Sequence, residues 1–202
     1  MKDSLYTLIY SALLGTLCAV LLTATSAFCK PRQEANEKAE IIRNKLSVLG
    51  VTFDPKASAE TLIQLYDSSV ADTEYDGLDT FVYPKEGTPK AIGVPIEGPG
   101  LWGPIHGFMS LDGDLSTIRA VSFYKQEETP GLGGEISTPG FQKQFEGKTI
   151  DGLHFVRGKK AQKTNEIDAI SGATLTCNKI QKMIDQLADR LKSVRAAKQT
   201  RG

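Results

Sequence analysis

Near its start the chain carries a long stretch of apolar residues. The run LYTLIYSALLGTLCAVLLTATSAFC, residues 5–29, contains no charged side chain. As a helix it extends about 38 Å, enough to cross a hydrocarbon core of about 30 Å. A cleaved secretory signal is the alternative, since Thr25, Ser26 and Ala27 are small, but the apolar part of such a signal is usually only about 7–15 residues long. The pattern therefore predicts a retained transmembrane anchor over residues 1–30.

Apolar side chains recur at helical spacing beyond the anchor. Within RQEANEKAEIIRNKLSVLG they lie about one turn apart, at Ala39, Ile42, Leu46 and Leu49. Gly50 follows directly, as is typical after the C-terminus of a helix. The segment SAETLIQLYDSSV indicates a second, shorter helix with Ser58 as its N-terminal cap. Both helices belong to a predicted membrane-proximal helical segment, residues 31–75.

From about residue 76 the pattern changes to short strands and turns. TFVYP and AIGVPI flank the turn KEGTPK, and GFMSL and TIRAVSFY flank DGDLS, whose Asp-Gly pair is a strong hairpin signal. A further strand, LHFVRG, precedes a helix with one apolar face, formed by Ile180, Met183, Ile184, Leu187, Leu191 and Val194. We therefore predict an α+β domain over residues 76–202, with a mainly antiparallel sheet and a C-terminal helix packed on it.

Charge and cysteine content narrow the range of functions. The 24 basic residues balance 24 acidic residues, which is not the charge pattern of a nucleic-acid-binding protein. The three cysteines, Cys18, Cys29 and Cys177, are too few and too scattered for a disulfide framework or a C-x-x-C metal site. The two histidines, His106 and His154, have no acidic or thiol partner at ligand spacing. We expect neither a nucleic-acid partner nor a metal site.

The sequence DAISGATLTCNK opens the last predicted helix with three hydroxyl groups. Ser171, Thr174 and Thr176 exceed what a single cap requires, although capping alone is the alternative explanation. Gly172 and Ala173 leave the backbone open to a bulky group. Because the N–H groups and the dipole of a helix N-terminus favour an anion, this segment indicates a phosphate-binding site.

A second unusual segment, EETPGLGGEI, follows the strand that ends near Tyr124. Pro130 fixes φ, and Gly131, Gly133 and Gly134 permit positive φ, so a simple turn explains the composition. The same glycines expose backbone N–H groups and allow a flat ligand to lie against the chain. On these residues alone, a ligand-binding turn and a purely structural turn both stay open.

Three motifs together resemble one family of membrane proteins. In this order and after an N-terminal span, GPGLWGPIHGFMSL, FYKQEETPGLGGEI and DAISGATLT are similar to the NqrC family, which belongs to the Na⁺-translocating NADH:quinone oxidoreductase. The likeness covers nearly the whole chain. The related flavin-binding protein of the Rnf ferredoxin:NAD⁺ oxidoreductase shares the threonine motif and ETPGLG, whereas Leu101-Trp102 and the FYKQEETPGLG context favour the quinone reductase.

The resemblance implies a covalently bound FMN, joined through its phosphate to the threonine of a motif written D-x-x-S/T-G-A-T. Thr174 is then the attachment residue, and the phosphate is surrounded by Ser171, Gly172, Ala173 and Thr176. Glu128 and Thr129 become polar contacts of the isoalloxazine, with Leu132 as an apolar wall. Asp168 is assigned to recognition by the Mg²⁺-dependent flavin transferase that installs the cofactor. Three further residues are left without an assigned role: Trp102, Lys148 and Cys177.

The function implied by the resemblance is electron transfer by the bound flavin. The chain is expected to work with the other subunits of a membrane redox complex that oxidises NADH, reduces ubiquinone and exports Na⁺. It is not catalytic alone, and no catalytic residue is assigned. Two alternatives stay open: a flavin-carrying member of the Rnf complex, and a single-span scaffold that is never flavinylated.

The charges that flank the membrane span and the family resemblance predict opposite sides of the membrane for the C-terminal domain. The basic residues between Lys30 and Lys45 outnumber Lys2 on the other side of the span, and this count favours a cytoplasmic body. The resemblance implies a single-pass protein of the bacterial inner membrane whose C-terminal domain is periplasmic. Because long domains cross largely regardless of flanking charge, we expect the periplasmic orientation.

Overall fold

A computed structural model of the chain describes residues 2–158 and 160–201, with side chains described for 4–158 and 160–197. The chain forms two compact units, residues 1–40 and residues 41–202. The first unit is helical, and the second contains the sheet together with the remaining helices.

Helix α1, Lys2–Leu49, is a single helix of 48 residues that continues through Pro31. The sequence predicted an anchor and a separate helix beyond it, and the observed helix joins the two. Pro31 removes one helical hydrogen bond and its ring crowds the carbonyl of Ala27, but the Gln, Glu, Ala and Lys residues that follow it favour the helical conformation. Among the described residues, this helix is the one long and apolar enough to span a membrane, with a mean hydropathy of 2.0 in its most apolar window.

A five-stranded antiparallel sheet forms the centre of the second unit. Its strands lie in chain order: β1 (Ala71–Tyr75), β2 (Leu78–Tyr83), β3 (Ala91–Pro99), β4 (Pro104–Leu111) and β5 (Ile118–Lys125). The predicted hairpins β2–β3 and β4–β5 are both present. Strand β1 was not predicted because its residues, ADTEY, are mostly polar and exposed at the sheet edge. Asp76 and Gly77, with φ of 51° and 79°, form the two-residue turn that connects it to β2.

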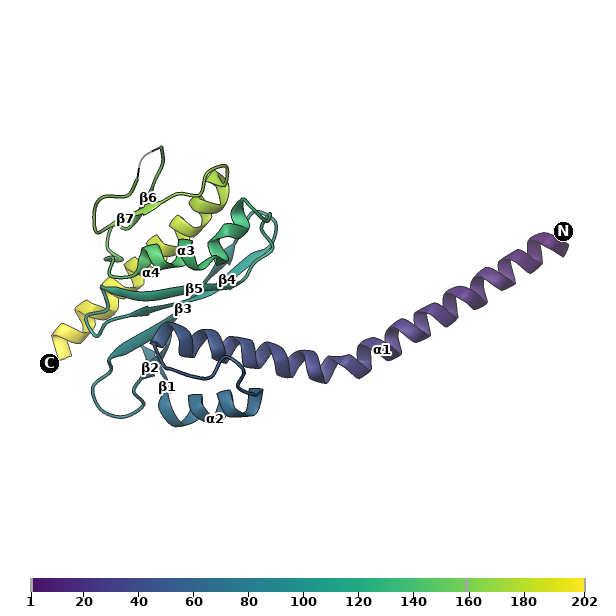
Figure 1. Cartoon of the computed structure of the whole chain (residues 1–202), viewed down its shortest axis with the longest axis horizontal. Coiled ribbons are helices and arrows are strands. Elements are labelled where there is room, and N and C mark those ends of the chain that lie inside the picture. The colour runs from purple at the N-terminus through teal and green to yellow at the C-terminus, as the bar shows by residue number, and fades with distance from the viewer. Residues whose placement is uncertain (1, 159, 202) are drawn as a thin grey trace. The chain divides into compact units, whose positions relative to one another are not determined.

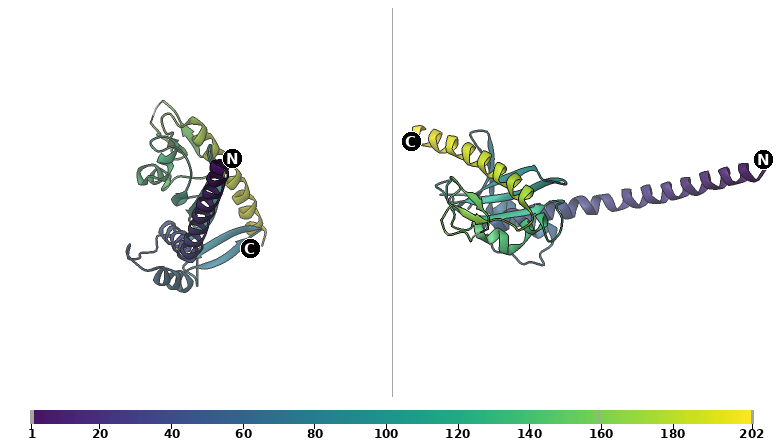
Figure 2. Two further views of the ribbon diagram at one scale, coloured as in Figure 1. Left: turned by 90° about the vertical axis from the view of Figure 1, so that its right-hand side faces the viewer. Right: turned by 90° about the horizontal axis from the view of Figure 1, so that it is seen from above.

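Helices cover both faces of this sheet (Figures 1 and 2). Helix α2, Ala59–Ser69, is capped by Ser58 as predicted and packs with residues 41–49 of α1 on one face, where the core includes Leu46, Leu62, Phe81 and Phe108. Helix α4, Thr174–Arg201, packs its predicted apolar face on the other. The boundary expected at residues 75/76 therefore divides one compact unit, because residues 41–75 share a core with the sheet.

Short elements connect β5 to α4. They are η1 (Gly133–Ser137), α3 (Pro139–Gln142), η2 (Lys143–Phe145), β6 (His154–Val156) and β7 (Glu166–Asp168). Strands β6 and β7 pair in parallel, apart from the main sheet. Strand β7 was not predicted, since three residues are too few for a periodic pattern. It leads the chain directly into the segment before α4, and the architecture is the predicted mixed α+β class.

Candidate functional site

The N-terminus of α4 lacks a side-chain cap. Thr174 is the first helical residue, and the first intrahelical bond runs from Cys177 N to Ala173 O at 3.0 Å. Ala173 stands at the capping position and has no side-chain acceptor, so the N–H groups of the first turn lie ahead of the intrahelical ladder. Gly172, with φ of 77°, makes the turn that brings the chain to this start. Thr174 itself is exposed. An exposed hydroxyl therefore lies beside free backbone donors at the positive end of the helix dipole.

A shallow cavity of about 130 Å³ adjoins Thr174. It is lined by residues 101–102, by four residues between 128 and 133, and by residues 172–176. Three motifs that are far apart in the sequence thus meet at one place. Large apolar side chains around it stay exposed, namely Leu101, Trp102, Leu132 and Leu175, and Trp102 has 69% of its surface exposed. Exposed apolar groups gathered around an exposed polar residue are typical of a site that another group covers.

Glu128 is the buried polar centre of this site, with only 5% of its surface exposed. One carboxylate oxygen accepts bonds from Leu101 N at 2.6 Å and Trp102 N at 3.3 Å, and the other accepts from Thr176 Oγ1 at 2.6 Å. A Cβ on Gly100 or Gly133 would lie 2.5 or 2.6 Å from these oxygens. The carboxylate therefore fixes the Leu101-Trp102 loop and the ETPGLG turn against the first turn of α4.

The glycines of the ETPGLG turn have different roles. Gly131 adopts φ of 74°, the conformation that the sequence led us to expect of such a turn. Gly133 is instead required by close approach, since its Cβ would also meet Thr176 Oγ1 at 2.5 Å. Thr129 is exposed, and its carbonyl accepts bonds from Leu132 N and Gly134 N. The turn is consequently held by its own backbone bonds on one side and by Glu128 on the other.

The predicted phosphate residues separate into an exposed group and a buried one. Ser171, Gly172 and Thr174 are exposed, whereas Ala173 and Thr176 are buried. The Thr176 hydroxyl donates to Glu128, so in this arrangement it faces the interior of the site. Their roles toward a cofactor stay predictions.

Asp168 ends β7, three residues before Ser171. Its backbone N–H donates to Gln144 Oε1 at 2.8 Å, and its carboxylate accepts a hydrogen bond from Ala161 N. The first bond joins β7 to η2, and the second holds the β6–β7 loop close to Asp168, beside the segment that leads to Thr174. The assignment of Asp168 to transferase recognition stays a prediction, and its half-buried carboxylate also has this local structural task.

Two residues without an assigned role are now located. The Lys148 ammonium donates to Lys163 O at 3.0 Å and so stabilises the loop before β7. Cys177 is fully buried in the first turn of α4, and burial raises the pKa of its thiol. A buried, protonated thiol is a poor nucleophile compared with an exposed hydroxyl that an enzyme can reach.

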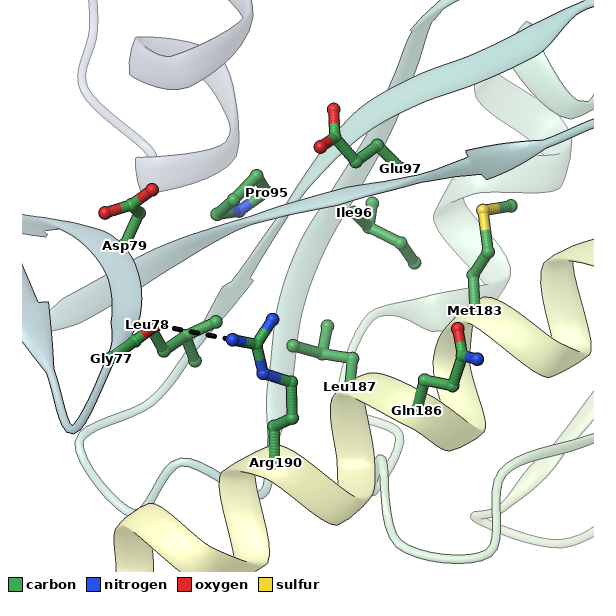
Figure 3. Close-up of a pocket in the computed structure, with 10 residues that line it drawn as sticks. All are labelled: Gly77, Leu78, Asp79, Pro95, Ile96, Glu97, Met183, Gln186, Leu187 and Arg190. Carbon is green, nitrogen blue, oxygen red and sulfur yellow. Dashed lines mark hydrogen bonds between the residues drawn. The ribbon is translucent and has the colours of Figure 1, made fainter.

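A second cavity, of about 210 Å³, lies between α4 and strands β2 and β3 (Figure 3). Its walls are mainly Leu78, Ile96, Met183 and Leu187, and Arg190 at its edge donates to Gly77 O at 3.3 Å. It contains none of the residues predicted to bind a cofactor. Within the described residues, no cluster of three or more histidine, cysteine or acidic side chains is arranged to hold a metal ion.

Comparisons with known proteins identify the family of the chain. Residues 100–189, which include every residue that lines the cavity at Thr174, match the FMN-binding domain family. The NqrC protein of the Na(+)-translocating NADH-quinone reductase of Pasteurella multocida is 30% identical, over 88% of this chain and 87% of its own length. Its counterpart from Chlamydia trachomatis is 41% identical over 44% of this chain and 35% of its own length. The crystal structure of the counterpart from Parabacteroides distasonis superposes with a TM-score of 0.65 at 28% identity, covering 82% of this chain and 96% of that one.

Proposed function

The chain belongs to the NqrC family of the Na(+)-translocating NADH-quinone reductases, and from this premise we propose that it carries FMN as a phosphoester on Thr174. The main support for this proposal is the exposed Thr174 at an uncapped helix start, beside a cavity that residues of all three motifs line. Bound FMN supplies one- and two-electron redox chemistry, and through it the protein transfers electrons within a Na⁺-exporting membrane complex.

The residues present fit the phosphate end of the cofactor. Free N–H groups in the first turn of α4 can donate hydrogen bonds to an anion, and Thr174 supplies the ester oxygen. Gly172 allows Leu132 to pack closely on the backbone before Thr174, because a Cβ there would meet Leu132 Cδ2 at 2.9 Å. Ser171 is an exposed hydroxyl three residues away and serves as a further donor.

Attachment needs an activated flavin nucleotide and an enzyme. The Thr174 oxygen loses its proton and forms the new bond to phosphorus, while a phosphoanhydride bond of the flavin donor breaks and its nucleotide leaving group departs. The flavin transferase must supply the base, since the described structure has no side-chain acceptor on the Thr174 hydroxyl. Asp168 and the β6–β7 loop it fixes form the surface we assign to recognition by this enzyme.

The residues proposed to surround the isoalloxazine ring have two different roles. Leu132 and Thr129 are exposed at the cavity and contact the isoalloxazine directly. Glu128 and Thr176 are buried and bonded to each other, so we assign them to holding the walls of the site in position. Trp102, exposed on the loop that Glu128 fixes, joins the apolar wall.

Replacing Thr174 tests the attachment. Thr174→Val keeps the shape of the side chain but removes the ester oxygen, and we expect no covalent flavin after co-expression with the flavin transferase. Thr174→Ser keeps the oxygen and is the matched control. Intact mass and in-gel flavin fluorescence of the denatured chain measure the outcome. Flavin retained by Thr174→Val would move the attachment to another residue.

Sidedness is the second part of the proposal: we place residues 41–202 in the periplasm. Cys18 and Cys29 are replaced by Ser, and exposed Thr88 is replaced by Cys in the turn between β2 and β3. A thiol reagent that crosses the outer membrane but not the inner one is expected to label this variant in intact cells. A matched variant that retains Thr88 controls for Cys177, which is buried. Labelling only after the inner membrane is broken contradicts the periplasmic orientation.

A further inference from the structure

We infer that the Arg157 guanidinium supplies the positive charge that balances the phosphoester. A hydrogen bond to Asn178 positions this side chain, which forms the phosphate site together with the first turn of α4. The inference rests on the proposed attachment at Thr174. A phosphodiester carries one negative charge at neutral pH, and a guanidinium has planar N–H donors that suit its oxygens.

Strand β6 runs beside α4 and approaches its N-terminus as the chain advances. Gln181 Nε2 donates to Leu153 O at 2.7 Å, and Phe155 N donates to Gln181 Oε1 at 3.1 Å. Two residues further along, the Arg157 guanidinium donates to Asn178 Oδ1. The contacts thus move nearly one turn along α4, from 181 to 178, in the direction of Thr174.

Asn178 lies four residues after Thr174, so their side chains are neighbours on one face of the helix, with Cβ atoms about 5–6 Å apart. Both residues are exposed, as is Arg157. The bond to Asn178 engages Arg157 through Nη2, which leaves the other guanidinium donors for a group next to it. The bond therefore places the Arg157 guanidinium at Asn178, the residue one helical turn after Thr174.

The electrostatics of the first turn agree with this position. Burial raises the pKa of the Cys177 thiol, and the positive charge of Arg157 acts in the opposite direction on the same group. Arg157 is thus close enough to affect a side chain between Thr174 and Asn178. Two other basic residues of the region have other partners. The Lys148 ammonium donates to Lys163 O, and Lys163 Nζ lies 4.0 Å from Glu166 Oε1.

Phosphorus-31 NMR of the flavinylated full chain in detergent tests the inference at the phosphate itself. We compare wild type with Arg157→Gln, Asn178→Ala and Lys179→Gln. Lys179 is the matched control, because it is an exposed cation in the same turn but points about 140° away from Thr174 around the helix. The phosphodiester resonance is expected to move in Arg157→Gln and, less, in Asn178→Ala, while Lys179→Gln leaves it in place.

Thermal unfolding supplies a second readout. In each background we measure the difference in Tm between the flavinylated and the unmodified chain, at low and high salt. Arg157→Gln should reduce this difference by about 2–4 °C at low salt, and less at high salt, since the pair is exposed and screened. The unmodified proteins should have Tm values within about 2 °C of each other, because a single exposed hydrogen bond is lost.

The outcomes separate the inference from the proposed function. Wild-type chain without flavin mass on Thr174 overturns both. A flavinylated wild type with Arg157→Gln indistinguishable from Lys179→Gln overturns the inference alone. If Arg157→Gln cannot be flavinylated, Asn178→Ala provides the test, because it keeps the Arg157 charge and removes the hydrogen bond that positions it. A phosphodiester resonance that does not move in Asn178→Ala contradicts the inference, and one that moves supports it.

Discussion

Removing the Glu128 carboxylate should separate the walls of the cofactor site and destabilise the whole second unit. Glu128→Ala deletes two short bonds of 2.6 Å, from Leu101 N and Thr176 Oγ1, and a weaker one of 3.3 Å from Trp102 N. Hydrogen bonds to a charged group contribute about 1.5–3 kcal/mol each, and Thr176, only 2% exposed, is left without its acceptor. We expect a loss of about 3–5 kcal/mol, which lowers Tm by about 10 °C in a domain of this size.

The assay follows the full chain in detergent by thermal unfolding, and the anisotropy of the single tryptophan reports on the loop directly. Trp102 should become more mobile in Glu128→Ala, because its loop has lost its anchor. Covalent FMN incorporation should fall as well, although Thr174 is unchanged. Glu128→Gln keeps an acceptor for Leu101 N and should lose about half as much stability.

Glu127→Ala is the matched control, since Glu127 is the adjacent carboxylate but is exposed. Its effect on stability should stay within about 0.5 kcal/mol. The reasoning is refuted if Glu128→Ala unfolds at the same temperature as Glu127→Ala and accepts FMN equally well, because the carboxylate then fixes neither the loop nor the helix start.

Two further predictions concern packing and pH. Gly133→Ala places a Cβ 2.5 Å from Thr176 Oγ1, and it should lower the free energy of unfolding by about 1–3 kcal/mol and reduce flavinylation. Gly140→Ala is the control and should do neither, because a Cβ at this position has no neighbouring atom within 4 Å. Thermal unfolding and intact mass measure the two effects. Arg195 donates two 2.7 Å bonds to Asp151 and holds the pKa of that carboxyl below 3.8. Because the pKa of Asp151 is lower in the folded than in the unfolded state, the stabilisation is complete above about pH 4 and is lost as the pH falls further. Arg195→Gln should therefore lower the free energy of unfolding by about 1 kcal/mol at pH 7 and by progressively less below pH 4. A difference in unfolding that does not depend on pH would contradict this prediction.

The sequence predicted those parts of the fold that carry a periodic pattern. The apolar face of α4 and the cap of α2 at Ser58 were recognised because each depends on residues within one or two helical turns. Strand β1 was missed because an exposed edge strand has no apolar alternation. The anchor and the next helix were expected as separate elements, but the structure has one helix through Pro31, where the Gln, Glu, Ala and Lys residues that follow favour the helical conformation.

The sequence indicated the three motifs that line the candidate site, but not the contacts between them. The pairing of Glu128 with Thr176 joins residues 48 positions apart, and no local pattern indicates it. Both residues were predicted as cofactor contacts on the resemblance, and this stays a prediction; the structure adds the hydrogen bond between them and their burial. Arg157 was overlooked because its relation to Thr174 depends on β6 running beside α4. The one available signal was a basic residue at the end of the predicted strand LHFVRG.

The small size of the cavity is a physical argument for the covalent attachment that we propose. Pockets that retain a ligand of this size by contacts alone usually measure about 300–1,000 Å³ and bury most of its surface, whereas the cavity at Thr174 measures about 130 Å³. A tether replaces that missing contact area with a high effective concentration. The cofactor can then stay largely uncovered, which a protein that exchanges electrons with its neighbours requires. The exposed side chains of Leu101, Trp102 and Leu175 around Thr174 are consistent with a surface that a neighbouring protein of the complex covers.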